Sequence, residues 1–209
     1  MEGPPPFSAP VKKKNTGLII ALVIGGIALC CIGPMLLVAG GGFFFFNKGK
    51  DLIACGQSIG FMRAAVIDYA KANGGKLPQA DKWVDQVRPY YKKRVSNLKD
   101  EQKMFGAASA EGDWGCSAEG TRTGIAFNTA LSGKTLASIT DKSTVLLFET
   151  TSTGANLNQL FKPLPENTSP KIMGNPRGWF TAPLEGKIKA GKGTFSSEGG
   201  NVTFEVDEK

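Results

Sequence analysis

The sequence contains no histidine, which removes the commonest general base and the commonest metal ligand of proteins. Neither a Ser-His-Asp triad nor a Cys-His nucleophile pair can form, and zinc sites that use histidine are excluded as well. Charged residues make up 21% of the chain and hydrophobic residues 41%, values typical of a globular protein. We therefore expect a folded protein that is not an enzyme and that holds no metal and no cofactor.

Two short motifs imitate catalytic signatures. Residues 56–60, GQSIG, match the G-x-S-x-G nucleophile elbow, but that motif needs a strand-turn-helix context and a histidine partner. Residues 132–135, SGKT, resemble the end of a Walker A loop, but Asn128 stands where the loop's first glycine should be. We interpret the first match as part of a helix and the second as a polar turn.

Charge is absent from residues 15–47, and within that window residues 18–38 read LIIALVIGGIALCCIGPMLLV. About 20 apolar residues in a helix are enough to cross the hydrocarbon core of a bilayer. We therefore expect residues 1–17 to be a basic cytoplasmic tail or leader. Residues 18–46 would be a transmembrane helix with an exit rich in glycine and phenylalanine, and residues 47–209 one exported globular domain.

The charges that flank this segment favour one orientation. Three lysines at residues 12–14 precede it, whereas Lys48 and Lys50 follow it, so the positive-inside rule favours N-in and C-out. A cleaved signal peptide is the alternative, because Val38-Ala39-Gly40 resembles a cleavage site of small residues. The apolar run is longer than a typical signal core, which favours an uncleaved anchor in contact with the lipid bilayer.

The four cysteines divide between the two parts of the chain. Cys30 and Cys31 fall inside the predicted span, where thiols behave as small apolar groups. Cys55 and Cys116 are the pair in the exported part. In an oxidising compartment they would form one disulfide, and the alternative is two buried, reduced thiols.

Hydrophobic periodicity predicts an α+β domain. One helical stripe follows the anchor and ends at Asn73-Gly74-Gly75; it consists of Leu52, Cys55, Ile59, Met62, Val66 and Tyr69. A short second helix starts with Asp81 as N-cap and ends before Pro89. Strands are expected at residues 124–128, 144–150, 178–182, 193–196 and 201–206, the last two as a hairpin. The expected fold is a transmembrane helix extended by an amphipathic helix that packs on an antiparallel sheet.

A basic run follows the second helix. The net charge is +7, and the densest cluster is Tyr90, Tyr91, Lys92, Lys93 and Arg94. Aromatic and basic side chains together are typical of patches that bind anionic ligands such as DNA or polysaccharide. A cationic helix end is also what the helix dipole favours, and the net charge alone is ordinary for a solvated surface. Nucleic acid is therefore not the partner that we expect.

Several stretches together resemble the type IV pilin-like (pseudopilin-like) proteins of bacteria. They are AVIDYAKANGGK at 65–76, LPQADKWV at 77–84, GIAFNTALSGKTLASI at 124–139 and STVLLFE at 143–149. In that family a cysteine opens the soluble helix, a Y-A-x-x-x-G-x-L-P segment ends it, and a second cysteine follows an aromatic residue. Cys55, Tyr69-Ala70, Leu77-Pro78 and Trp114 with Cys116 occupy these places.

The resemblance implies a membrane-anchored structural or interaction protein of the bacterial inner membrane. Its globular domain would be periplasmic or extracellular, and its partners other pilin-like subunits or components of a secretion system. Leader cleavage would fall between Gly17 and Leu18, and Leu22 then stands where the family usually has a glutamate that assists assembly. We expect a minor pseudopilin or a non-polymerising relative, and an extracellular module that binds an anionic ligand is the alternative.

Overall fold

The computed structural model describes most of the part that we expect to be exported. The described residues are 51–97, 114–118, 120–172, 174–191, 193–198 and 201–206. The expected tail, cleavage position and membrane span at residues 1–46 lie outside them. Within the described ranges, no helix has both the length and the apolar character needed to cross a membrane.

The first helix covers residues 51–72, and the predicted apolar stripe lies on its buried side. Ile59, Met62 and Val66 are fully buried. Gly74 follows the end of the helix, and its φ of +63° lies in the left-handed region that favours glycine. The N–H of Gly75 then donates to the carbonyl of Ala70 at 2.8 Å, so the helix closes with a Schellman-type cap as the glycine pair indicates.

The second helix, α2 (Trp83–Ser96), follows the 3-10 turn η1 (Ala80–Lys82) and is longer than predicted. The prediction that Pro89 ends it is wrong, because Pro89 lies inside the helix. A proline in a helix interior costs about 3 kcal/mol, but the buried face continues past it through Tyr91 and Val95. Burial of these two side chains offsets the missing hydrogen bond.

Asp81 is not the N-cap of α2, which is also a correction. The N-cap position is Lys82, and its side chain makes no cap hydrogen bond. Instead the side-chain oxygen of Asn156 accepts the N–H of Val84 at 2.7 Å. The cap therefore comes from a loop that is distant in the sequence.

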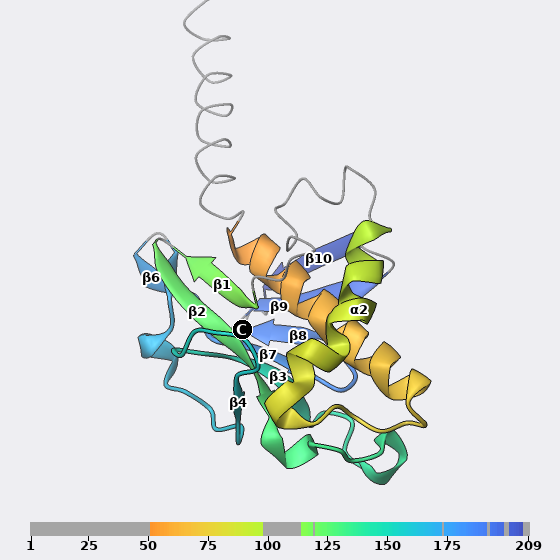
Figure 1. The fold of residues 1–209 in the computed structure, drawn as a ribbon. Helices are drawn as coiled ribbons and strands as arrows, with labels where there is room; N and C mark the ends of the chain where they lie inside the picture. The colour runs from red at the N-terminus through yellow and green to blue at the C-terminus, as the bar shows by residue number, and fades with distance from the viewer. Residues whose placement is uncertain are drawn as a thin grey trace, which may run out of the picture. The chain divides into compact units, whose positions relative to one another are not determined.

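Eight strands of the described chain form one curled sheet, in the order β1-β2-β3-β7-β8-β9-β10, with the short β4 beside β2 (Figure 1). All pairs are antiparallel except β2 with β4, and β5 with β6 forms a separate two-stranded sheet. The strands are β1 (Gly115–Ala118), β2 (Thr121–Asn128), β3 (Val145–Thr150), β4 (Asn158–Gln159), β5 (Lys171–Ile172), β6 (Asn175–Pro176), β7 (Phe180–Pro183), β8 (Ile188–Ala190), β9 (Gly193–Glu198) and β10 (Asn201–Val206).

The prediction of an α+β domain with an antiparallel sheet is thus confirmed for the described residues. All five predicted strands are present, and β9 and β10 form the expected hairpin, with Glu198 opposite Asn201. The prediction missed β1 and β8, which are short, and the two-residue strands. Such strands offer too few alternations to stand out in a sequence.

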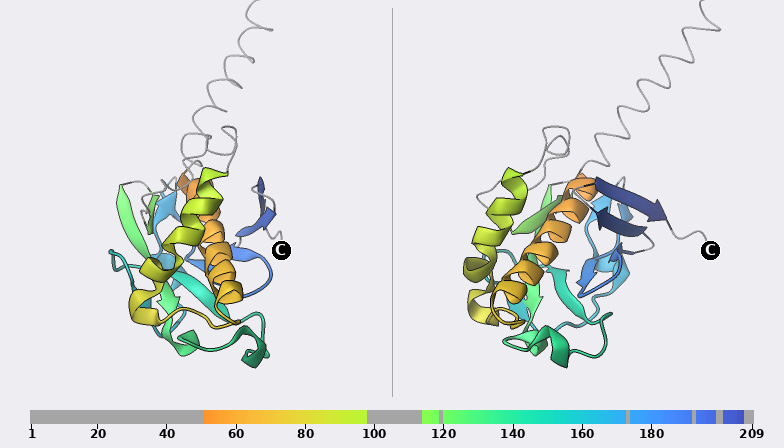
Figure 2. Two further views of the ribbon diagram at one scale, coloured as in Figure 1. Left: turned by 45° about the vertical axis from the view of Figure 1, so that its right-hand side comes forward. Right: turned by 90° about the vertical axis from the view of Figure 1, so that its right-hand side faces the viewer.

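The two helices lie on one side of the sheet, and the core lies between these layers (Figure 2). Trp83 is fully buried and stacks on Phe127 of β2, with ring centroids 6.0 Å apart. Trp114 meets the edge of Trp83 at 5.4 Å. These rings join α2 to the sheet.

A disulfide joins Cys55 in the first helix to Cys116 in β1, with the two Cα atoms 5.2 Å apart. Both cysteines are buried. The bond ties the helix that follows the expected anchor directly to the sheet.

Candidate functional site

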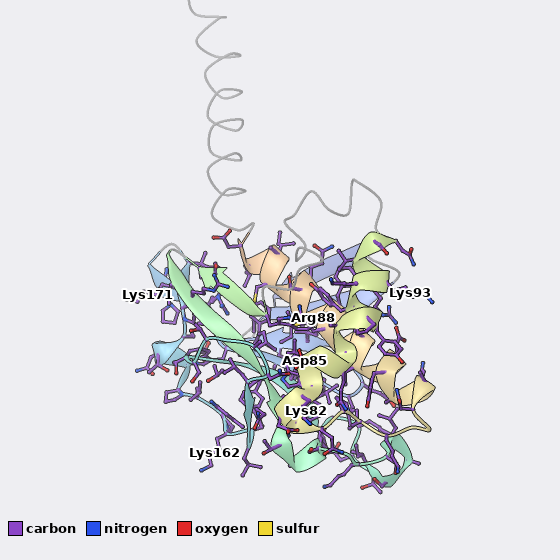
Figure 3. All side chains as sticks on the ribbon, viewed as in Figure 1. Lys82, Asp85, Arg88, Lys93, Lys162 and Lys171 are labelled. Atoms are coloured by element: carbon purple, nitrogen blue, oxygen red, sulfur yellow. A yellow bond between two sulfur atoms is a disulfide. The ribbon has the colours of Figure 1, made fainter. Side chains whose placement is uncertain are left out.

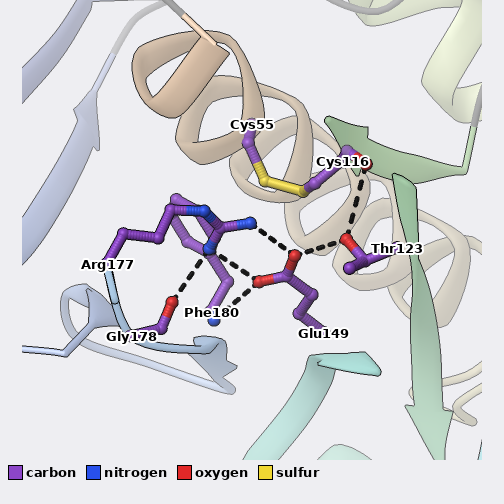
Figure 4. Close-up of a disulfide and its surroundings, with 7 residues drawn as sticks. All are labelled: Cys55, Cys116, Thr123, Glu149, Arg177, Gly178 and Phe180. Carbon is purple, nitrogen blue, oxygen red and sulfur yellow. Dashed lines mark hydrogen bonds and ion pairs between the residues drawn. A yellow bond between two sulfur atoms is a disulfide. The ribbon is translucent and has the colours of Figure 1, made fainter. Parts of the chain in front are cut away.

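A buried ion pair lies beside the disulfide (Figure 4). Glu149, in β3, is 1% exposed, and its carboxylate receives both terminal nitrogens of Arg177, one of them at 2.8 Å. The hydroxyl of Thr123 in β2 and the backbone N–H of Phe180 in β7 also donate to this carboxylate. Both carboxylate oxygens are therefore hydrogen-bonded, which is the condition under which a buried charge is tolerated.

Arg177 is held from several sides. Its guanidinium lies 4.8 Å from the centre of the Phe180 ring, and one terminal nitrogen donates to the carbonyl of Gly178 at 2.9 Å. Its side chain is 3% exposed. Glu149 lies in β3 and is also bonded to Thr123 of β2, whereas Arg177 lies just before β7. The ion pair therefore joins β2 and β3 to the segment that leads into β7. We interpret it as a structural centre.

The same centre contacts a surface segment, residues 165–172 and 174–179. The N–H of Arg177 donates to the carbonyl of Pro170 at 3.0 Å, and the N–H of Gly178 donates to the hydroxyl of Ser169 at 2.9 Å. Gly178 has a φ of +83°, and a Cβ added there would lie 2.1 Å from the backbone nitrogen of Gly191. Only glycine fits this close approach.

Trp179 is oriented by the same segment. Its indole N–H donates to the carbonyl of Pro165 at 3.0 Å, and this carbonyl also accepts the hydroxyl of Thr168 at 2.6 Å. The ring is partly exposed. An aromatic ring is thus held in one orientation at the surface by a backbone carbonyl of a neighbouring loop.

A pocket of about 360 Å³ opens beside Trp179. Its described lining combines two cations, one aromatic ring and a series of hydroxyl groups: Thr121, Arg122, Thr123, Thr151, Thr168, Ser169, Pro170, Lys171 and Trp179. This volume lies at the lower end of the range for small-molecule sites. The cations among the described lining residues are Arg122 and Lys171.

Two smaller hollows share lining residues with this pocket. One, of about 170 Å³, shares Trp179 and is lined mainly by apolar groups, among them Phe148, Phe161 and Leu164. The other, of about 160 Å³, shares Arg122 and Thr123. Each of the two hollows therefore shares part of its lining with the pocket beside Trp179.

The predicted patch at residues 90–94 is divided between two faces of α2. Tyr91 is fully buried against Trp114, and Tyr90 meets the edge of Tyr69 at 5.8 Å. Arg94 forms a 2.7 Å ion pair with Asp68. Lys92 and Lys93 are exposed, and Figure 3 shows Lys93 on the opposite side of the view from Lys171. The five residues thus do not form one surface.

The two imitations of catalytic motifs have the expected structural context. Ser58 lies inside the first helix and is 6% exposed. Residues 132–133 form a turn, and the hydroxyl of Ser132 accepts the N–H of Ala80 at 3.0 Å. Among the described residues, no group of three or more acidic or cysteine side chains is placed to hold a metal. Gly17 and Leu18 lie outside this part of the chain.

Comparisons with family models, with curated proteins and with solved structures found no match to this chain. The pocket beside Trp179 was not predicted from the sequence. Arg122, Lys171 and Trp179 come from three separate segments, and no local motif connects them. The one local feature of the sequence that could have indicated the pocket is the hydroxyl-rich composition of residues 121–123 and 150–153.

Proposed function

We propose that this chain is a membrane-anchored structural or interaction protein of the bacterial envelope, related to the pilin-like proteins. In this proposal residues 18–38 hold the protein in the inner membrane, and the described domain lies outside the cytoplasm. The domain meets its partners there, whether other pilin-like subunits or components of a secretion system.

The disulfide between Cys55 and Cys116 carries the proposal. Disulfides persist in oxidising compartments and are rare in the cytosol. Cys55 follows the expected transmembrane segment, residues 18–46, on its C-terminal side, so an exported Cys55 agrees with the N-in, C-out orientation that the lysines favour. The helix packed on an antiparallel sheet agrees with the fold that the pilin-like resemblance implies.

The first test is the state of the thiols in native membranes. A mass-tagged alkylating reagent, applied to denatured protein without reduction, should label Cys30 and Cys31 and leave Cys55 and Cys116 unlabelled. After reduction all four should react. Labelling of Cys55 and Cys116 before reduction would place the domain in a reducing compartment and overturn the proposal.

The mature N-terminus, determined by mass spectrometry on protein from the same membranes, separates the remaining models. A chain that begins at Leu18 has lost a leader and is a candidate filament or secretion subunit. A chain that begins at Met1 is a permanently anchored relative. A chain that begins at or just after Ala39 has lost a signal peptide, which would overturn the anchor.

The alternative, an anionic ligand on residues 90–94, has its own test. Arg94→Ala would break the ion pair with Asp68, so Lys92→Ala with Lys93→Ala is the cleaner variant. If the protein binds DNA through this region, that double variant should lose most of its retention on a DNA column. Unchanged retention would remove the alternative.

A further inference from the structure

We propose that residues 160–166 form a self-complementary surface through which two copies of this chain associate about a two-fold axis. The setting rests on the proposed function, because copies anchored in one membrane meet at a raised effective concentration, at which a small contact suffices. The surface itself is inferred from the exposure, the charges and the fixed conformation of this segment.

The segment carries the exposed apolar side chains of the domain. In the described ranges, the large hydrophobic residues that are exposed are Leu160 and Leu164, at 59% and 39%. Leu164 borders the hollow of about 170 Å³, which is lined mainly by apolar groups, Phe161 and Trp179 among them. A hollow of this size can take an apolar group of a partner, since a cavity of about 150 Å³ with apolar walls holds benzene. Exposed apolar side chains beside such a hollow are typical of interaction surfaces.

The segment is held at both ends. The N–H of Phe161 donates to the side-chain oxygen of Asn128 at 3.4 Å, and the carbonyl of Pro165 accepts the indole N–H of Trp179 at 3.0 Å. Pro163 and Pro165 also restrict the residues before them to extended conformations. A surface that is ordered in advance loses little entropy when it binds a partner.

The charges of the segment are complementary to those of the same segment in reverse. Lys162 and Glu166 are exposed, and both line the hollow together with Leu164, which lies midway between them in the sequence. Figure 3 shows Lys162 at the outside of the molecule, near β4. Among the described residues, neither charged side chain has a hydrogen bond or an ion pair. The other carboxylate of the hollow, Glu149, is already paired with Arg177.

A two-fold contact uses these charges twice. In such a contact residue i of one copy meets residue j of the other, and j meets i. Two antiparallel segments would therefore place each Lys162 opposite the Glu166 of the second copy, with the two Leu164 side chains at the axis. A partner surface of one charge sign would instead oppose a like charge at one of the two positions. The order of cation, apolar residue and anion thus favours a second copy as the occupant.

The experiment measures association of the full chain in liposomes of phosphatidylethanolamine and phosphatidylglycerol. Copies with Cys30→Ser, Cys31→Ser and Lys92→Cys are labelled with a donor or an acceptor dye on α2, outside the segment. Energy transfer between the dyes, followed as lipid is added, gives the dissociation constant. We expect transfer above the level of random proximity, which decreases as lipid dilutes the protein.

Charge variants test the pairing. Lys162→Glu and Glu166→Lys should each weaken self-association about tenfold, because both pairs of the dimer change from attraction to repulsion. The two variants mixed together should associate as the wild type does, since every pair then has opposite charges. This recovery also shows that both variants are folded. Lys134→Glu, the same charge change at an exposed residue outside the segment, should have no effect.

A further variant tests the apolar centre. Leu164→Ala removes the same apolar group from both copies at the axis, and we expect it to weaken association about tenfold. Adding the two charge substitutions together, Lys162→Glu with Glu166→Lys, to one chain should leave association near that of the wild type, because each pair keeps one cation and one anion.

Several outcomes would overturn the inference. They are random transfer for the wild type, or self-association of both single charge variants at wild-type strength. Loss of association in Leu164→Ala without recovery in the mixed charge variants would indicate a different partner, and would also overturn it. Association that no substitution in the segment changes would belong to another part of the chain, with the same consequence. None of these results bears on the thiol and N-terminus tests, so the proposed function and this inference can fail separately.

Discussion

Glu149 and Arg177 form an ion pair in the interior, and both carboxylate oxygens of Glu149 receive a terminal nitrogen of Arg177 (Figure 4). The side chains are 0% and 3% exposed, respectively. The pair connects β3 with the segment that leads into β7, and this segment also carries Ser169, Lys171 and Trp179, which line the pocket of about 360 Å³. Stability and the shape of the candidate site therefore depend on the same contact.

Breaking this pair should destabilise the domain strongly. Glu149→Gln leaves the positive charge of Arg177 buried without its partner, and we expect a loss of about 3–5 kcal/mol in the free energy of unfolding. Urea unfolding of the full chain in micelles, followed by tryptophan fluorescence, measures it. Adding Arg177→Met to Glu149→Gln should recover part of the loss, because no unpaired charge remains.

The Arg94–Asp68 pair is the matched control for that experiment. Its side chains are 38% and 34% exposed, so water screens the charges. Arg94→Ala should cost less than about 1 kcal/mol. Similar losses in the free energy of unfolding for Glu149→Gln and Arg94→Ala would mean that water reaches the Glu149–Arg177 pair, contrary to the structure.

The disulfide should supply a separate part of the stability. Cys55 and Cys116 are 61 residues apart in sequence, and closing a loop of this length in the unfolded chain is worth about 4 kcal/mol in the chain-entropy model. Cys55→Ser with Cys116→Ser should lower the urea midpoint accordingly, and a reductant should then have no further effect on the variant. Cys30→Ser with Cys31→Ser is the control and should unfold as the wild type does.

Substitutions of Asn156 test how much its side chain stabilises the N-terminus of α2. Its φ of +53° is the one positive value at a non-glycine residue in the described ranges, and its side chain accepts from Val84 and donates to Asp85. Asn156→Gly keeps the backbone conformation and loses the cap, which costs about 1 kcal/mol. Asn156→Ala should cost about 1–2 kcal/mol more, because a Cβ is strained in this region. Equal stability of the two variants would show that the strain is negligible.

The sequence predicted the elements whose signal is local. The stripe from Cys55 to Val66, the glycine stop at Gly74 and the hairpin that joins β9 to β10 each depend on residues that are close in the chain. Pro89 misled the prediction because burial of Tyr91, a tertiary effect, outweighs the local preference of proline. Long-range contacts left no local pattern.

The candidate site shows the same limit. Glu149 falls in a predicted strand, but nothing around it indicates that Arg177, 28 residues away, neutralises its charge. Likewise the pocket needs Arg122 from β2 and Lys171 from β5, which meet only because β2 and β3 are joined to the later chain. A cluster that the fold assembles from single residues has no sequence motif to detect.

The last prediction concerns Tyr91 and alkaline pH. The ring is 0% exposed, and its hydroxyl has no hydrogen-bond partner among the described residues. Burial raises the pKa of this phenol above its ordinary value of 10.0. The folded state therefore keeps the proton at a pH where the unfolded chain loses it, and stability that is complete below about pH 10 falls as the pH rises further.

The measurement compares Tyr91→Phe with the wild type by urea unfolding between pH 7 and pH 11.5. At pH 7 the variant should be within about 1 kcal/mol of the wild type, because a hydroxyl without a partner contributes little. Above pH 10 the wild type should lose up to about 1.4 kcal/mol per pH unit more than the variant, the value for one proton. Tyr90→Phe, which removes a partly exposed phenol from the same helix and leaves Tyr91 in place, should retain that excess loss. Parallel pH profiles for Tyr91→Phe and the wild type would show that water reaches the Tyr91 hydroxyl in the folded protein.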